Sequence, residues 1–416
     1  MDKFEEIKEQ TKEEIIKTQR STANFPPLSV ETLIEILGLT VKQDKENKLT
    51  TFLCMLSAFS ENSQFNISYN APSSTGKSYI PLEIAQLFPK EDVKKTGYAS
   101  PTAFFHEKGE FSKELGGYEV DLERKILIFL DQPHSLLLQH LRPLLSHDDK
   151  IIVLKITDKT QRWGLRTKNV LIKGFPSVIF CTGSLNIDEQ EATRMILLSP
   201  ETTQEKIREA ILGRVEKESD PEAYKTWLEA DERRQELKER IKTIKEANIR
   251  HIIIPQPEKI YEQFVSRYKF LKPRHSRDIS RLMSLIKSLA LLNLWGKKHK
   301  EKDIIADEDD INETFKIWDK ISESQELGIP PYIYRLYQEI IVPAWKEKQN
   351  DLSRQEIIQK HFQIYGRSLP DWQLRRQIIP MLDSAGLIIQ EPDPIDRRKM
   401  LIRPICSQDI GNSTVG

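Results

Sequence analysis

Eight consecutive residues, from Ala71 to Ser78, have the types and spacing of a loop that binds phosphate groups. In the pattern G-x-x-x-x-G-K-[ST], backbone N–H groups point at the phosphates. Gly76 would let the backbone come close, Lys77 would reach the β- and γ-phosphates, and Ser78 would bind Mg²⁺. Ala71 replaces the first glycine, which is a modest departure if its φ is negative. The pattern predicts ATP and Mg²⁺ as ligands, and the alternative is a chance match in a turn. The loop residues are Ala71, Pro72, Ser73, Ser74, Thr75, Gly76, Lys77 and Ser78.

An acid ends the next strongly apolar run. ILIFL at 126–130 leads to Asp131, about fifty residues after Lys77, an interval that fits one further strand and helix. Such an acid holds Mg²⁺ directly or through water, and the alternative for Asp131 is a strand-end cap. The next residue is Gln132, which can orient water but cannot accept a proton.

A parallel sheet would bring these residues together. FNISYN (65–70) alternates like a strand before the loop, and KSYIPLEIAQLF (77–88) follows it as a helix. KILIFLDQ (125–132) is continuously apolar, which is typical of a central parallel strand, and SVIFCTGS (177–184) is a further buried strand. Strands that alternate with helices predict an α/β fold with helices on both faces of the sheet.

The amino-acid composition limits the kinds of function that the chain could have. Lys+Arg and Asp+Glu both number 63, so a chain-wide basic field is absent and any DNA site must be a local patch or a ring of subunits. The three widely spaced cysteines, Cys54, Cys181 and Cys406, show neither zinc-ligand spacing nor a disulfide framework, which fits a cytoplasmic protein. The charged N-terminus does not resemble a signal peptide, and no apolar run reaches the length of a membrane span.

From about residue 60 to 320 the chain resembles the AAA+ ATPases, and more closely the MCM-like helicases of mobile elements and phages. The phosphate loop corresponds to Walker A and ILIFLD131–Gln132 to Walker B, where hydrolysing members carry Glu at the position of Gln132. The resemblance implies that Thr182 acts as sensor 1, Arg194 as an arginine finger for a neighbour's ATP, and Arg277 as sensor 2. The alternatives are a salt-bridged surface arginine for Arg194 and an ordinary basic residue on an exposed helix for Arg277. The implied catalytic set is Lys77, Asp131, Gln132, Thr182, Arg194 and Arg277.

The resemblance also implies a β-hairpin that points into a ring pore and grips DNA. The runs at 150–156 and 168–174 fit that place in the order of elements. Basic residues interleaved with an aromatic suit single-stranded DNA, through phosphate pairing and base stacking. The alternative is a solvated hairpin with its tryptophan packed on the body. The candidate DNA-binding residues are Lys159, Arg162, Trp163, Arg166 and Lys168.

After residue 330 two helical stretches precede two short strands, which is the pattern of a winged helix. Ser353 and Glu356 form a capping-box signature at the start of one helix. This unit would grip duplex DNA or serve as a protein contact. Its candidate DNA-binding residues are Arg375, Arg376, Arg397 and Arg398.

The predicted domains follow from these elements. No segment corresponds to the N-terminal DNA-binding domain of MCM proteins, because only seventy residues precede the loop. We therefore expect a partner, either a DNA-binding protein or a primase. The expected divisions are an N-terminal helix and linker (1–29), an AAA+ core (30–215), a helical lid with a charged insertion (216–328), a winged-helix domain (329–406) and a disordered tail (407–416).

Three functions compete at this stage. The first is an ATP-driven DNA helicase or translocase of DNA replication that works as a homo-oligomeric ring, for example a hexamer. The second is a loader or scaffold that hydrolyses ATP slowly, which Gln132 favours. The third is a non-enzymatic DNA-binding regulator, against which Lys77, Ser78 and Asp131 argue.

Overall fold

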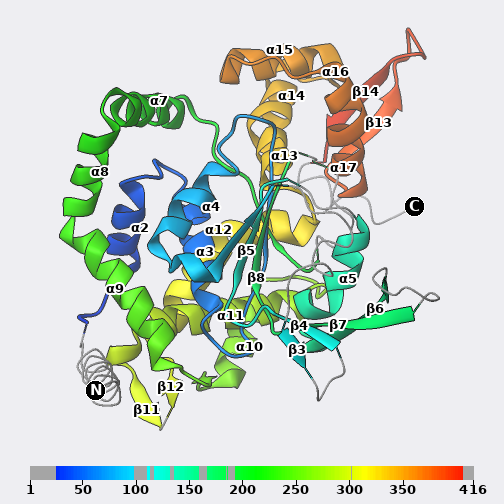
Figure 1. The fold of residues 1–416 in the computed structure, drawn as a ribbon. Helices are drawn as coiled ribbons and strands as arrows, with labels where there is room; N and C mark the ends of the chain where they lie inside the picture. Colours follow the sequence, from blue (N-terminus) through cyan, green and yellow to red (C-terminus); the bar gives the residue numbers. More distant parts are fainter. Residues whose placement is uncertain are drawn as a thin grey trace, which may run out of the picture.

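The computed structural model describes residues 25–97, 110–112, 117–131, 135–158, 166–183, 185, 193–300 and 302–405. Within these residues five strands pair in parallel into a central sheet with the order β2-β5-β8-β1-β9 (Figure 1). The predicted α/β class with a mostly parallel sheet is confirmed. The strands are β1 (Ile67–Asn70), β2 (Val93–Thr96), β5 (Ile126–Phe129), β8 (Ser177–Thr182) and β9 (Ile196–Leu198).

Helices cover both faces of this sheet because the side chains of its central strands alternate between two apolar cores. Ile126 and Ile128 belong to the core that the N-terminal helices share, whereas Leu127 and Phe129 belong to a second core with α5. The helices are α2 (Val30–Gly38), α3 (Lys45–Ser57), α4 (Tyr79–Ile84) with a 3-10 turn at Ala85–Leu87, and α5 (Ser135–Leu145).

A second sheet with the order β3-β4-β7-β6 packs on the α5 side. The predicted hairpin is confirmed as an antiparallel pair, β6 (Ile151–Asp158) with β7 (Arg166–Lys173). Two short strands, β3 (Glu110–Ser112) and β4 (Gly117–Asp121), were not predicted. They are too short and polar to show a clear alternation. A Cβ atom on Gly117 would lie 2.6 Å from the Asn169 carbonyl oxygen of β7, so close strand pairing requires glycine there.

The charged stretch after the sheet is helical, as predicted. It forms an arch of α7 (Gln204–Ser219), α8 (Pro221–Ala230) and α9 (Glu232–Ala247) around α2 (Figure 1). Leu237 and Ile241 are buried in the main core, whereas Trp227 is 51% exposed.

Between this arch and the C-terminal unit lie three helices and a small sheet. They are α10 (Pro257–Val265), α11 (His275–Leu292), α12 (Glu308–Leu327) and the strands β10 (Ile252–Ile253), β12 (Asp303–Ile305) and β11 (Lys298–Lys300).

The C-terminal unit builds a third apolar core from helices and one antiparallel hairpin. The predicted capping box is present: Ser353 Oγ accepts from Glu356 N, and Glu356 Oε2 accepts from Ser353 N at 2.7 Å. The elements are α13 (Pro331–Leu336), a π-helical turn (Tyr337–Ile341), α14 (Val342–Lys348), α15 (Arg354–Tyr365), α16 (Asp371–Gln373), a second π-helical turn (Leu374–Ile378), α17 (Ile379–Ser384), β13 (Ile388–Pro392) and β14 (Met400–Pro404).

Among the described residues, no helix combines the length and the apolar character needed to cross a membrane. Residues 1–24 of the predicted N-terminal helix and linker, and the tail predicted at 407–416, lie outside the described residues.

Candidate nucleotide site

The loop from Ala71 to Ser78 connects β1 to α4, which confirms the predicted strand–loop–helix setting. Ala71 does not have a positive φ, so the backbone requires no glycine there. Positive φ angles at Ser74 (65°) and Gly76 (93°) curl the loop. The backbone N–H groups of Gly76, Lys77 and Ser78 donate no hydrogen bond to any part of the chain that the structure describes. Consecutive N–H groups of this kind form a concave site that suits an anion.

Contacts inside the loop hold its first half. The Pro72 carbonyl oxygen accepts hydrogen bonds from Thr75 Oγ1 at 2.9 Å and from Lys77 Nζ at 3.4 Å. The Cys181 thiol of β8 donates to the Lys77 carbonyl oxygen at 3.3 Å. Burial raises the pKa of Cys181 to about 12, so the thiol stays protonated and serves as a donor. Lys77 is therefore folded back on its own loop and would have to leave Pro72 to meet a phosphate.

Strand register brings three predicted site residues to one edge of the sheet. Asn70, at the end of β1, pairs with Thr182 at the end of β8, and the Ala71 N–H donates to the Thr182 carbonyl oxygen at 3.5 Å. On the other side of β8, Phe129 pairs with Phe180, so Asp131 follows at the same edge and is exposed. The carboxyl ends of parallel strands are where open α/β sheets bind ligands. β8 thus places Thr182 between the loop and the acid.

The donor set at this edge fits Mg²⁺. Ser78 offers a hydroxyl and Asp131 a carboxylate, and Mg²⁺ is commonly bound through one or two such groups together with waters and substrate phosphates. Across the described ranges, His, Cys, Asp and Glu form no cluster of three or more that could hold a metal.

The two candidate arginines lie at the opposite edge. Ile196, at the start of β9, pairs with Ile67 at the start of β1, and Arg194 comes two residues earlier. Arg194 Nε donates at 2.8 Å to the Oγ atom of Ser146, the residue that follows α5. Arg277, exposed in the first turn of α11, donates to the Thr193 hydroxyl. About 10 Å of strand separates this edge from the loop. The structure thus brings Arg194 and Arg277 together and away from their own chain's loop.

Several predicted residues cannot be placed. Gln132, Lys159, Arg162 and Trp163 lie outside the described residues. Arg166 and Lys168 belong to the described backbone at the start of β7.

The four C-terminal arginines are exposed, as a DNA contact would require. Arg375 and Arg376 lie in the π-helical turn before α17, and Arg397 and Arg398 lie in the turn between β13 and β14. Arg398 Nε pairs with Asp396 at 3.0 Å.

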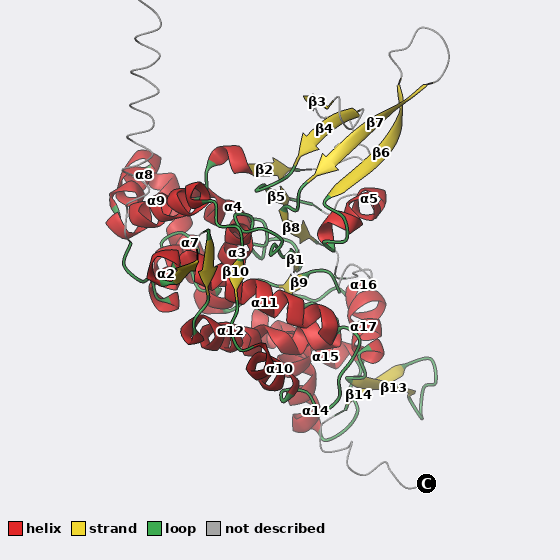
Figure 2. Cartoon of the chain, turned by 90° about the horizontal axis from the view of Figure 1, so that it is seen from below, coloured by secondary structure: helices red, strands yellow, loops and turns green. Residues whose placement is uncertain are grey.

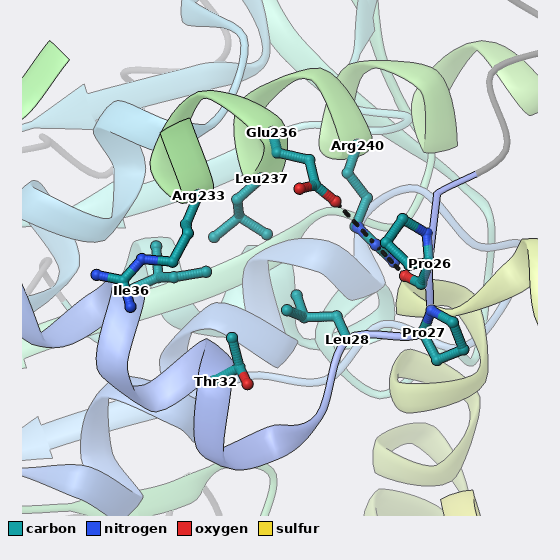
Figure 3. A pocket seen from close by; sticks show the side chains of 9 residues that line it. All are labelled: Pro26, Pro27, Leu28, Thr32, Ile36, Arg233, Glu236, Leu237 and Arg240. Atoms are coloured by element: carbon teal, nitrogen blue, oxygen red, sulfur yellow. Dashed lines mark hydrogen bonds and ion pairs between the residues drawn. The ribbon is translucent and has the colours of Figure 1, made fainter. Parts of the chain in front are cut away.

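A cavity of about 180 Å³ lies elsewhere, between α9 and the segment that enters α2 (Figure 3). Arg240 lines it, but its guanidinium already donates to the Leu292 carbonyl oxygen at 3.0 Å and to Asn293 Oδ1 at 3.2 Å. The same group lies over the rings of Phe25 and Trp295, at 5.1 Å and 5.6 Å from their centroids. These contacts explain Arg240 as a buried group that joins α9 to the N-terminal segment, rather than as a ligand-binding residue.

Sequence reasoning missed two residues beside the loop. Lys206, at the start of α7, donates to the Thr75 carbonyl oxygen at 3.4 Å and pairs with the buried Asp44. No motif marks either residue, because their contact with the loop depends on segments far apart in the chain.

Comparison of the chain with protein-family models and with curated proteins finds no match.

Proposed function

We propose that the chain is an AAA+ ATPase of the MCM-like type, a DNA helicase or translocase of DNA replication that works as an oligomeric ring. The observation that carries the proposal is the shared edge of β1, β8 and β5, with the phosphate loop, Thr182 and Asp131 at successive strand ends. The N–H groups of Gly76, Lys77 and Ser78, which donate no hydrogen bond within the described residues, support a phosphate ligand over a chance turn.

Each residue at this edge has a separate task. The Lys77 ammonium would meet the β- and γ-phosphates, while Ser78 and Asp131 would hold a Mg²⁺ ion, which when bound would supply positive charge to the transferred group. Thr182 and Gln132 orient the attacking water. No group in this set is a strong base, so positioning and electrostatics carry the acceleration.

The placement of the arginines supports an oligomer. Arg194 and Arg277 are remote from their own loop, so an arginine that joins Lys77 at the γ-phosphate would come from a neighbouring subunit. Head-to-tail contact of the arginine edge with the next subunit's loop would generate a ring. ATP binding would then order the interface between subunits.

The hairpin of β6 and β7 supplies the proposed grip on DNA. Its strands extend away from the central sheet (Figure 2). In sequence, Lys159, Arg162 and Trp163 fall between the two strands and outside the described residues, while Arg166 and Lys168 belong to the start of β7. The C-terminal unit of helices and a hairpin, proposed as a winged helix, presents Arg375, Arg376, Arg397 and Arg398 as a second contact, to duplex DNA or to a protein.

A slowly hydrolysing loader or scaffold is the second candidate. The observation that favours it is Gln132, which cannot take a proton from water. Both functions need ATP at the same edge, and they differ in turnover and in its response to DNA.

Steady-state ATP turnover with and without single-stranded DNA tests the proposal. A motor should turn over ATP, and single-stranded DNA should stimulate it. Lys77→Ala should abolish turnover and binding of a fluorescent ATP analogue, because it removes the charge that meets the terminal phosphates. An ATP turnover rate that single-stranded DNA does not change would favour the loader or scaffold. A Lys77→Ala chain that binds the analogue as well as wild type would show that the loop is not a nucleotide site.

A further inference from the structure

Lys206 lies beneath the phosphate loop, and its ammonium makes two hydrogen bonds and one ion pair. Its side chain is 11% exposed. Nζ donates to the Glu201 carbonyl oxygen at 2.9 Å and to the Thr75 carbonyl oxygen at 3.4 Å, and it pairs with the Asp44 carboxylate. Nζ also lies 4.0 Å from the position that a Cβ atom on Gly76 would occupy. The ammonium therefore touches the loop at its Thr75–Gly76 peptide.

Asp44 fixes the position of this ammonium. The residue is fully buried between α2 and α3. Its Oδ1 accepts from Asn47 Nδ2 at 2.8 Å and from the Glu201 N–H at 2.7 Å. A buried carboxylate held by this many donors keeps its partner in one place. The pair thus joins three segments that are far apart in sequence: the α2–α3 loop, the phosphate loop and the start of α7.

The contact determines which way the Thr75–Gly76 peptide faces. In a planar trans peptide the C=O and the following N–H point in opposite directions. Since Lys206 holds the Thr75 carbonyl, the Gly76 N–H must point to the other side of the peptide plane. The Gly76 N–H donates no hydrogen bond within the part of the chain that the structure describes, so it is available to an anion.

We propose that Lys206 is a positioning residue for the polyphosphate of the nucleotide. It acts on the peptide that donates to the phosphates, whereas Lys77 would contact a phosphate itself. This inference rests on the proposed nucleotide function. Because Asp44 neutralises Lys206, removing the ammonium should affect the orientation of the peptide far more than long-range attraction to phosphate.

The chain offers a matched control on the same helix. Lys217 of α7 also pairs with a buried acid, Glu83, at 3.0 Å, but no contact joins it to the loop among the described residues. Lys206→Met and Lys217→Met therefore both remove an ion pair from α7. Only Lys206→Met also releases the Thr75 carbonyl oxygen.

The experiment compares the affinity of the full chain for ATP, ADP and AMP, by competition with a fluorescent ATP analogue, and the melting temperature without nucleotide. Lys206→Met should lower the affinity for ATP and for ADP by about tenfold or more, which is the equivalent of one lost hydrogen bond to a charged group. It should lower the affinity for AMP much less. Lys217→Met should leave all three affinities unchanged. Asp44→Asn should reproduce part of the loss, and Lys206→Arg should restore part of it. Lys206→Met should melt at a lower temperature than Lys217→Met, because it leaves the fully buried Asp44 carboxylate without its cation, but both variants should keep a cooperative transition.

The outcomes separate the two proposals. A wild-type chain that fails to bind the ATP analogue would overturn the nucleotide function itself. If wild type binds and Lys206→Met has the affinities of Lys217→Met, the nucleotide function stands and the positioning role is wrong. If Lys206→Met and Asp44→Asn both lose the cooperative thermal transition without nucleotide, Lys206 is a structural group and the inference is also overturned.

Discussion

Position 132 is where a single functional group decides between the two candidate functions. A glutamine after Asp131 can orient water but cannot itself accept a proton from it. The rest of the proposed site, with Lys77, Ser78 and Thr182, does not depend on that choice.

Gln132→Glu should raise ATP turnover, because a carboxylate supplies the missing base to an otherwise complete site. Steady-state hydrolysis measures the effect. Binding of a fluorescent ATP analogue serves as the control and should be retained. A fall in turnover with unchanged binding would mean that Gln132 is itself the adapted residue and orients water in a way that glutamate cannot.

The hairpin of β6 and β7 is the element whose proposed function can be tested apart from the proposed ATP site. Replacing Lys159, Arg162 and Arg166 together with alanine should remove three phosphate contacts. The slope of log affinity for single-stranded DNA against log salt should then become shallower by about 2. Trp163→Ala should weaken binding by about 1–3 kcal/mol with little change in slope, if a base stacks on the ring.

Two lysines at the other end of the hairpin provide a matched control. Lys150, next to β6, pairs with Glu123 at 2.9 Å, and Lys173 of β7 pairs with Glu119 at 3.4 Å. Because both are already paired, their joint replacement by alanine should leave the salt slope unchanged. ATP binding should survive every hairpin variant, since the loop and Asp131 lie on the central sheet. An unchanged affinity and slope in the triple variant would rule out the hairpin as the DNA grip and make the C-terminal unit the leading candidate.

At the scale of the whole molecule, the proposed ring would build each ATP site from the loop edge of one subunit's sheet and the arginine edge of its neighbour's. Arg194→Ala and Lys77→Ala chains should each be inactive alone. A mixture should recover part of the ATPase activity, because a mixed ring can place an intact loop beside an intact arginine. Activity is measured over a range of mixing ratios.

The control for this mixture replaces one partner. Lys77→Ala mixed with the double variant Lys77→Ala, Arg194→Ala contains no intact loop and should stay inactive. Absence of recovery at every ratio in the first mixture would count against a shared site, and Arg194 would then be explained by its bond to Ser146.

The sequence by itself determined the elements whose signals are local. Continuous apolar runs marked β5 and β8, alternation marked β1, and the Ser353–Glu356 pair marked the start of α15, because each signal depends on neighbours within one strand or one turn. The phosphate loop was predicted for the same reason, since its pattern occupies eight consecutive residues. β3 and β4 escaped detection because they are short and obtain their partners from β7 and from each other.

Tertiary structure alone decided how these elements share a site. Strand order is set by packing between segments that are distant in sequence. As a result of this order, Thr182 lies between the loop and Asp131, whereas Arg194 and Arg277 lie at the other edge of the sheet. The pairing of Lys206 with Asp44 joins residues with no common motif. Their meeting depends on the path of the chain through β9 into α7, because hydrophobic periodicity specifies which face of an element is buried but not which element covers it.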